Sequence, residues 1–186
     1  MAVSGGVDMV QLREKEFSRK DLIKLGLKLR HITNARALLV VNGSLDVALA
    51  VGADGLHLPE NAMSVHDARQ AVPSHFLLGK SVHDISGATC AAREGADYLI
   101  LGTIFQTSSK PGVKTGGPEL VSMVTSLVHA PVLAIGGITA SSMATVIESG
   151  ASGVAVRSAI LDTRDPKSAA RELKQSMATM WLGIVS

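Results

Sequence analysis

The feature of this 186-residue sequence that most constrains its fold is a regular alternation of short apolar runs with longer amphipathic stretches. A strand, a helix and a second strand form a βαβ unit, whose right-handed crossover makes the two strands parallel. The apolar runs predict strands at Val7–Leu12, Ala37–Val41, Gly55–Leu58, Leu77–Gly79, Tyr98–Leu101, Val132–Ile135 and Gly153–Val156. The stretches between and after them predict helices at Arg19–His31, Leu45–Val51, Ser64–Ala71, Ile85–Glu94, Pro118–Val128, Ser141–Ser149 and Pro166–Met180. The chain is therefore expected to be an α/β protein.

Such units build either an open doubly wound sheet or a closed barrel. Three similar phrases, Gly-Ala-Asp-Gly after Val51, Gly-Ala-Asp after Glu94 and Gly-Ala-Ser-Gly after Ser149, each connect a helix to the next strand. Repeating one connection around a ring favours the (β/α)8 TIM barrel. The pattern supplies seven strands, and residues 1–6 resemble the end of a helix that runs into a strand. We therefore expect a TIM barrel that lacks its first strand and most of its first helix.

Composition limits the functional class. No linker, charge block or apolar run near the ~20 residues of a membrane span interrupts the chain, so residues 1–186 are expected to form one domain. A net charge of +2, with one Trp, one Tyr and three Phe, argues against nucleic-acid binding. Cys90 is the single cysteine, and no Cys/His spacing suggests zinc. A cytoplasmic protein that binds neither nucleic acid nor membrane is expected.

In TIM barrels, ligands bind at the carboxyl ends of the strands. The first predicted strand leads into Gln11, Arg13 and Lys15, which alternate onto one side, and two cations there suit a phosphate or pyrophosphate. A solvated strand end is the alternative. Gly136 and Gly137 leave backbone N–H groups accessible to an anion, and the next strand is followed by a serine that begins a short helix, Ser158. These segments fit the phosphate site after the last two strands of such barrels, with ordinary turn glycines as the alternative.

A polar loop follows the strand at Tyr98–Leu101 and predicts a lid, with a plain flexible loop as the alternative. Its phosphate-binding candidates are Thr107, Ser109 and Lys110. His57 is near a strand end and, with Lys110, is the candidate for a catalytic role. The other histidines fall on helices or loops: His31, His66, His75, His83 and His129. Asp54 and Asp97, in the repeated phrase, are expected to organise turns at the opposite end of the barrel.

In their order along the chain, these motifs resemble the family of thiamine phosphate synthase and its relative TenI, the thiazole tautomerase. The likeness runs from about Gly6 to Lys174 and includes the Val-Asn-Gly, Gly-Leu-His-Leu, Gly-Lys-Ser-Val-His and Ala-Ile-Gly-Gly-Ile-Thr segments. The resemblance implies a TIM barrel with one further strand at its start. The synthase joins a pyrimidine pyrophosphate to a thiazole phosphate and releases pyrophosphate. The residues that the resemblance assigns to the pyrimidine and its pyrophosphate are Gln11, Arg13, Lys15, Asn42, Ser81 and Lys110. Those it assigns to the thiazole phosphate are Thr107, Ser109, Gly136, Gly137 and Ser158.

The sequence departs from the family pattern at two kinds of position. Gly43 and Ala62 replace the aspartates that ligate magnesium in the synthase, with Glu60 as a neighbouring carboxylate, and Thr103 replaces the tautomerase histidine. Magnesium is left open as a cofactor, although the residues that would ligate it are lost. The resemblance implies no other cofactor. The expected function is a thiamine-biosynthesis enzyme that binds a phosphorylated heterocycle and couples or tautomerises a thiazole phosphate. The alternatives are a non-catalytic phosphate-binding relic and a metal-independent lyase or isomerase, and a homo-oligomer is left open.

Overall fold

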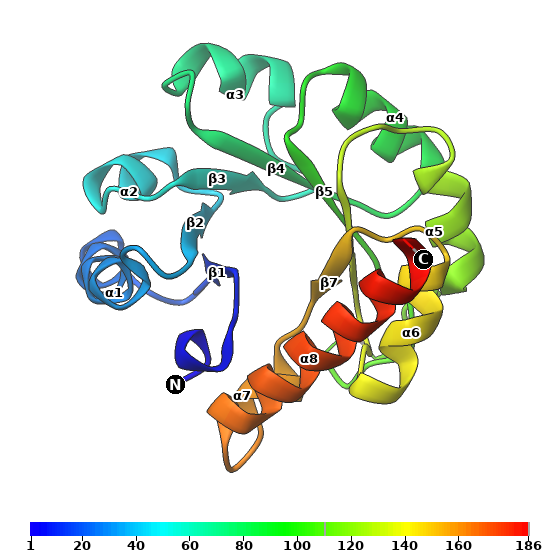
Figure 1. Ribbon diagram of the computed structural model, residues 1–186. Coiled ribbons are helices and arrows are strands. Elements are labelled where there is room, and N and C mark those ends of the chain that lie inside the picture. Colours follow the sequence, from blue (N-terminus) through cyan, green and yellow to red (C-terminus); the bar gives the residue numbers. More distant parts are fainter. Residues whose placement is uncertain (110, 186) are drawn as a thin grey trace.

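The computed structural model describes the backbone of residues 1–109 and 111–185, and the side chains of that range up to residue 181. Seven strands form one parallel sheet in the order of the chain, curled as in a TIM barrel (Figure 1). They are β1 (Met9–Leu12), β2 (Leu38–Asn42), β3 (Gly55–Leu58), β4 (Leu77–Val82), β5 (Tyr98–Leu101), β6 (Val132–Ile135) and β7 (Gly153–Ala155). Within the described residues β1 and β7 are the two edges and do not pair with each other. The expectation of a TIM-barrel fold with seven strands is confirmed.

Helices follow the strands and cover the outside of the curl (Figure 1). They are α1 (Arg19–Thr33), α2 (Leu45–Ala50), α3 (Val65–Ala71), α4 (Ile85–Arg93), α5 (Gly117–Thr125), α6 (Ala140–Glu148), α7 (Ser158–Leu161) and α8 (Pro166–Val185), preceded by the short 3-10 helix η1 (Val3–Gly5). The predicted short helix at Ser158 is confirmed. No helix among the described residues is long and apolar enough to cross a membrane.

Local sequence decides where several helices begin. The side chains of Ser18, Ser64 and Asp84 accept hydrogen bonds from the backbone N–H three residues later, which satisfies a donor that the first helical turn leaves unpaired. Thr139 and Ser142 satisfy each other's backbone N–H groups in a capping box at the start of α6. At these four helices the predicted start falls within one residue of the observed one.

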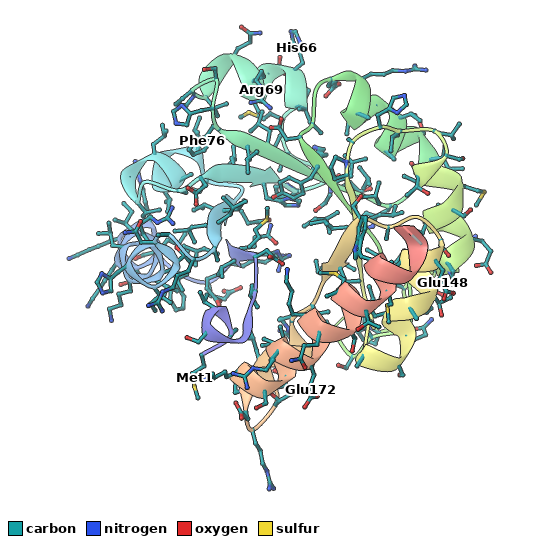
Figure 2. All side chains as sticks on the ribbon, in the orientation of Figure 1. Met1, His66, Arg69, Phe76, Glu148 and Glu172 are labelled. Atoms are coloured by element: carbon teal, nitrogen blue, oxygen red, sulfur yellow. The ribbon has the colours of Figure 1, made fainter. Side chains whose placement is uncertain are left out.

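The apolar core lies between the sheet and its helices. Alternate strand residues such as Leu39, Leu56, Leu78 and Leu99 belong to one buried cluster with helix residues such as Val47. The other side of each strand faces the inside of the curl, which side chains fill (Figure 2). The polar strand residues on this inner side are Gln11, Asn42, His57, Ser81 and Tyr98. Lys80 is the exception, because it alternates with Ser81 and is on the same side of β4 as Leu78 and Val82.

β4 is the strand that differs most from its prediction. The apolar run was expected to end at Gly79, but β4 continues to Val82 through the pairs Lys80–Leu99, Ser81–Ile100 and Val82–Leu101 with β5. The two polar residues Lys80 and Ser81 conceal the end of the strand in the sequence. The neighbouring strand supplies the hydrogen bonds that hold them in the sheet.

The aspartates of the repeated phrase connect neighbouring strands at the amino-terminal end of the sheet. Asp54 Oδ2 accepts hydrogen bonds from Leu39 N and Arg30 Nη1, both at 2.7 Å. Asp97 Oδ2 does the same for Leu78 N at 2.7 Å and Arg69 Nη2 at 2.5 Å. The expectation that these residues organise turns at the end opposite the site is confirmed.

We expect Asp54→Ala to lower the free energy of unfolding by about 2 kcal/mol, because Leu39 N–H and the Arg30 guanidinium both lose their acceptor. Urea unfolding followed by circular dichroism measures this change. The control is Asp162→Ala, since the exposed Asp162 side chain makes no hydrogen bond or ion pair with the described residues. Equal losses in the two variants would show that the Asp54 contacts contribute nothing specific.

Helix α8 packs beside both ends of the open sheet. It contacts η1 on the β1 side and α6 and α7 on the β7 side. Lys174 Nζ lies 2.6 Å from Asp8 Oδ1, just before β1. A side chain on Gly5 would collide with the Lys167 carbonyl, which shows how closely η1 and α8 approach.

Candidate functional site

The inner face of the sheet carries a layer of polar side chains, which lie toward the carboxyl ends of β1 to β4 and at the start of β5. Gln11 Nε2 donates to Asn42 Oδ1 at 3.4 Å, and Asn42 pairs in register with His57 on β3. His57 in turn pairs with Gly79, and Gly79 with Tyr98. The structure therefore brings together Gln11, Asn42 and Ser81, three residues that the sequence analysis assigned to the pyrimidine and its pyrophosphate.

His57 is buried in this layer, with 1% of its surface exposed. Its Nε2 lies 2.7 Å from Ser81 Oγ and its Nδ1 lies 3.3 Å from the Tyr98 hydroxyl. Burial, and then the positive charges of Lys80 and Arg13, lower the pKa of His57 to about 4. The imidazole is neutral near pH 7, and a base with so low a pKa is weak. The catalytic role of His57 stays a prediction.

Two cations follow β1. Arg13 and Lys15 are exposed and make no hydrogen bond or ion pair with the described residues. Arg13 directly follows β1, two residues after Gln11, and its positive charge contributes to the lowered pKa of His57. Two uncompensated cations at the mouth of the curl suit an anionic ligand. Lys110, the third predicted cation, lies outside the described residues.

The loops after β5, β6 and β7 meet at one corner of the mouth. Gly136 and Gly137 adopt φ angles of +104° and +63°, which only glycine adopts readily. Phe105 N donates to Gly136 O at 3.0 Å, and a Cβ on Gly137 would lie 2.3 Å from the Gln106 carbonyl oxygen. This contact places the loop that carries Thr107 beside the paired glycines.

Ser158 begins α7 at the same corner. The preceding residue, Arg157, donates from Nη2 to Ser109 Oγ at 3.3 Å and so joins the β7 end to the loop after β5. The sequence analysis missed Arg157. The signal that was available is a cation directly before the serine of a predicted phosphate site.

The residues present do not fit the magnesium site that the resemblance implies. Gly43 and Ala62 offer no side-chain oxygen, although both positions flank the same turn, since Gly43 N donates to His57 O at 2.8 Å and Ala62 N to Pro59 O at 3.0 Å. The nearby carboxylate, on Glu60, is 54% exposed and lies 3.5 Å from His83 Nε2. Among the described residues, no three His, Cys, Asp or Glu side chains gather as metal ligands. A cation that prefers several hard oxygen ligands finds too few here.

His83 lies beside Thr103, the position of the tautomerase histidine. It follows β4, and its Nδ1 donates to the carbonyl of Gly102, the residue before Thr103. Its Nε2 faces Glu60 Oε2 at 3.5 Å. A half-exposed imidazole between a carbonyl and a carboxylate is a common arrangement for a general acid or base. Thr103 itself is buried and cannot move a proton at neutral pH.

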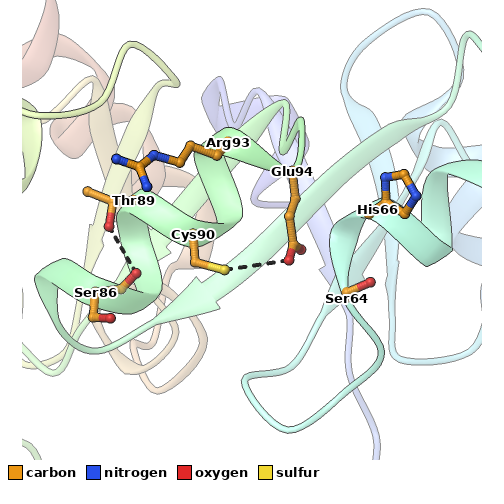
Figure 3. Close-up of a pocket in the computed structure, with 7 residues that line it drawn as sticks. All are labelled: Ser64, His66, Ser86, Thr89, Cys90, Arg93 and Glu94. Carbon is orange, nitrogen blue, oxygen red and sulfur yellow. Dashed lines mark hydrogen bonds between the residues drawn. The ribbon is translucent and has the colours of Figure 1, made fainter.

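One groove on the surface lies outside the barrel, between α3 and α4 (Figure 3). Its polar groups are engaged with one another: Glu94 Oε2 accepts from Val65 N at 2.8 Å, and Cys90 Sγ donates to Glu94 Oε1 at 3.5 Å. This contact with Glu94 raises the pKa of the Cys90 thiol, which makes it a poorer nucleophile. The side chains of this groove therefore hold the two helices together. They are a poorer candidate for a reaction site than the mouth of the barrel.

Comparisons with known proteins agree on one family. The thiamine monophosphate synthase family matches residues 1–160. A thiamine-phosphate synthase from Methanoculleus marisnigri is 45% identical over 96% of this chain and 85% of its own length. One from Methanoregula boonei is 41% identical over 96% of this chain and 83% of its own. The solved thiamine phosphate pyrophosphorylase from Pyrococcus furiosus superposes with a TM-score of 0.89 at 33% identity, covering 96% of this chain and 87% of that one. This chain therefore belongs to the thiamine monophosphate synthase family.

Proposed function

We propose that this chain acts in thiamine biosynthesis as a thiamine-phosphate synthase, which binds a thiazole phosphate and couples it to a pyrimidine pyrophosphate. The observation that carries the proposal is the meeting of three loops at one corner, where Arg157 bonds Ser109 beside Gly136 and Gly137. The polar layer of Gln11, Asn42 and Ser81 supplies the adjacent place for the second substrate. Relatives that are 45% and 41% identical carry the name thiamine-phosphate synthase, which supports this reaction.

In this reaction the chain's own residues bind, orient and compensate charge. The glycine N–H groups and Arg157 hold the thiazole phosphate, and the resulting orientation replaces a random encounter of the two substrates. Arg13 and Lys15 stabilise the negative charge that develops on the departing pyrophosphate. Because the residues present do not fit magnesium, no step is assigned to a metal, and coupling is expected to be slow.

A second candidate, tautomerisation of a thiazole carboxylate phosphate, is favoured by His83 and Glu60. This pair stands at the rim of the mouth, 3.5 Å apart, next to Gly102 and Thr103. A proton taken from one ring position by the imidazole and returned at another needs no metal. Both candidates bind the thiazole phosphate at the corner where the loops after β5, β6 and β7 meet. Ligand binding therefore tests this shared site, and product analysis distinguishes the two reactions.

The phosphate site that both candidates share is tested by calorimetric titration with the thiazole phosphate. We expect Arg157→Met to weaken binding about tenfold, because one charge-assisted hydrogen bond to the phosphate is lost. Arg164→Met is the matched control, since Arg164 is also exposed and its side chain makes no hydrogen bond or ion pair with the described residues. Equal affinities in both variants would show that Arg157 is not part of the phosphate site.

Turnover then decides the reaction. Incubation with both substrates, with and without magnesium, is expected to yield thiamine phosphate and pyrophosphate. Isomerisation of the thiazole carboxylate phosphate without coupling would establish the second candidate instead. Binding without either reaction would identify the non-catalytic relic, and absence of phosphate binding would contradict the proposed function altogether.

A further inference from the structure

Three neighbouring strands hold a chain of buried hydrogen bonds that ends at Ser81. The proposed reaction gives this chain no role so far. His57 on β3, Gly79 on β4 and Tyr98 on β5 are partners in register. The His57 imidazole lies between the Ser81 hydroxyl at 2.7 Å and the Tyr98 hydroxyl at 3.3 Å. These hydrogen bonds therefore connect a buried phenol to a serine on the inner face of the barrel.

Glycine at position 79 is what lets this chain form. A Cβ built on Gly79 would lie 2.1 Å from Tyr98 Cζ and 2.4 Å from the Tyr98 hydroxyl oxygen. The phenol therefore occupies the space that any side chain on the middle strand would need. Tyr98 reaches across β4 to His57 only because Gly79, the residue between them, has no side chain.

The direction of the hydrogen bonds follows from counting donors and acceptors. Tyr98 is 5% exposed, and among the described residues His57 Nδ1 is the hydrogen-bond partner of its hydroxyl. A buried phenol hydrogen without an acceptor is costly, so the phenol donates and Nδ1 accepts. A neutral imidazole with an accepting Nδ1 carries its hydrogen on Nε2, which then donates to Ser81 Oγ.

The Ser81 hydroxyl can consequently donate its own hydrogen to another group. Its oxygen already accepts from His57, and Ser81 is only partly buried, so its hydrogen is accessible to a ligand. The pKa of His57, lowered to about 4 mainly by burial, agrees with an imidazole that stays neutral and keeps this arrangement.

We propose that His57 is a positioning residue: Tyr98 holds it as the Nε2–H tautomer, and it fixes Ser81 as a hydrogen-bond donor toward an anionic pyrophosphate oxygen. In this arrangement Ser81 is neither a base nor a nucleophile, because His57 offers it no basic nitrogen. The inference rests on the proposed function for the identity of the anion, while the tautomer of His57 is a property of the chain alone.

The tautomer is read directly from the full chain. With nitrogen-15 in its histidines, long-range imidazole correlation spectra without ligand are expected to show His57 protonated at Nε2 and unprotonated at Nδ1. Tyr98→Phe keeps the ring and removes the phenol hydrogen, so it is expected to shift His57 toward the Nδ1–H form. A Nδ1–H form in the unchanged chain overturns the proposal.

Affinity for inorganic pyrophosphate tests the consequence for Ser81. We expect Ser81→Ala and Tyr98→Phe each to weaken binding about fivefold, the value of one ordinary hydrogen bond. The double variant is expected to bind no more weakly than Ser81→Ala, because both changes remove the same donor. His57→Gln, which keeps an N–H near the position of Nε2, is expected to retain more affinity than His57→Leu.

Additive losses in the double variant, or unchanged affinity in Tyr98→Phe with its tautomer shifted, would overturn the positioning role. Thermal unfolding of each variant separates an altered site from a loosened fold. If the unchanged chain binds no pyrophosphate, the proposed function and the ligand part of this inference both fail. The Nε2–H spectrum then still decides whether Tyr98 and His57 orient Ser81.

Discussion

A chain that carries both Gly43→Asp and Ala62→Asp is expected to form thiamine phosphate on the order of 100-fold faster in magnesium than the unchanged chain. Bound magnesium neutralises charge on a departing pyrophosphate, and two carboxylates supply the hard oxygen ligands that the described residues lack. A 100-fold gain corresponds to about 2.7 kcal/mol of transition-state stabilisation. Initial rates over a magnesium titration measure both the gain and its metal dependence.

The local geometry admits this change. A Cβ at position 43 would lie 3.6 Å from Pro59 Cγ, an ordinary van der Waals distance, and aspartate tolerates the positive φ of 72° better than most residues. Ala62 belongs to the turn that begins at Pro59, so the two new carboxylates would flank the same short segment. Ala62 also packs against the apolar cluster, so its replacement is expected to cost some stability.

The matched control is the pair Gly43→Asn and Ala62→Asn. It reproduces the size, the backbone strain and the loss of apolar packing, but it adds no negative charge. The asparagine pair is expected to show no magnesium-dependent gain. If the aspartate pair gains no more than the asparagine pair, loss of the metal ligands does not explain slow coupling, and the tautomerase candidate is strengthened.

Gly137→Ala is expected to lower the free energy of unfolding by about 3 kcal/mol and to weaken binding of the thiazole phosphate. A residue with a Cβ at φ +63° costs about 1 kcal/mol, and crowding adds roughly 2 kcal/mol. The crowding is severe because the new Cβ would lie 2.3 Å from the Gln106 carbonyl oxygen and 2.9 Å from Phe105 Cβ. Relief requires the loop after β5 to move away from Gly137, and so from the proposed phosphate site.

Gly52→Ala isolates the two causes. Gly52 has nearly the same φ, +62°, but a Cβ there would meet no heavy atom within 4 Å. We expect a loss of about 1 kcal/mol in Gly52→Ala and unchanged phosphate affinity, measured by urea unfolding and calorimetry. Similar losses in the two variants would mean that the loop after β5 yields easily and does not depend on Gly137 for its position.

The elements of the fold could be predicted because they depend on local pattern. Gly55–Leu58 and Tyr98–Leu101 are strands with the predicted bounds, since an uninterrupted apolar run suits a parallel strand covered by helices. Gly136 and Gly137 were recognisable as a place of close approach for the same local reason, because consecutive glycines remove side chains wherever they occur. The extension of β4 to Val82 was missed, because polar Lys80 and Ser81 join the strand through pairing with the neighbouring strands β3 and β5.

The sequence alone determined the order of strands and helices, the parallel sheet and the residues that reach the carboxyl ends of the strands. Hydrophobic periodicity and glycine chemistry act within a few residues, and they suffice for those conclusions. Only the tertiary structure decided that Tyr98 reaches His57 across Gly79, that Glu60 faces His83, and that Arg157 holds Ser109, 48 residues earlier in the chain. These contacts depend on register and on how the strands curl, which bring together side chains whose separation along the chain carries no local signal.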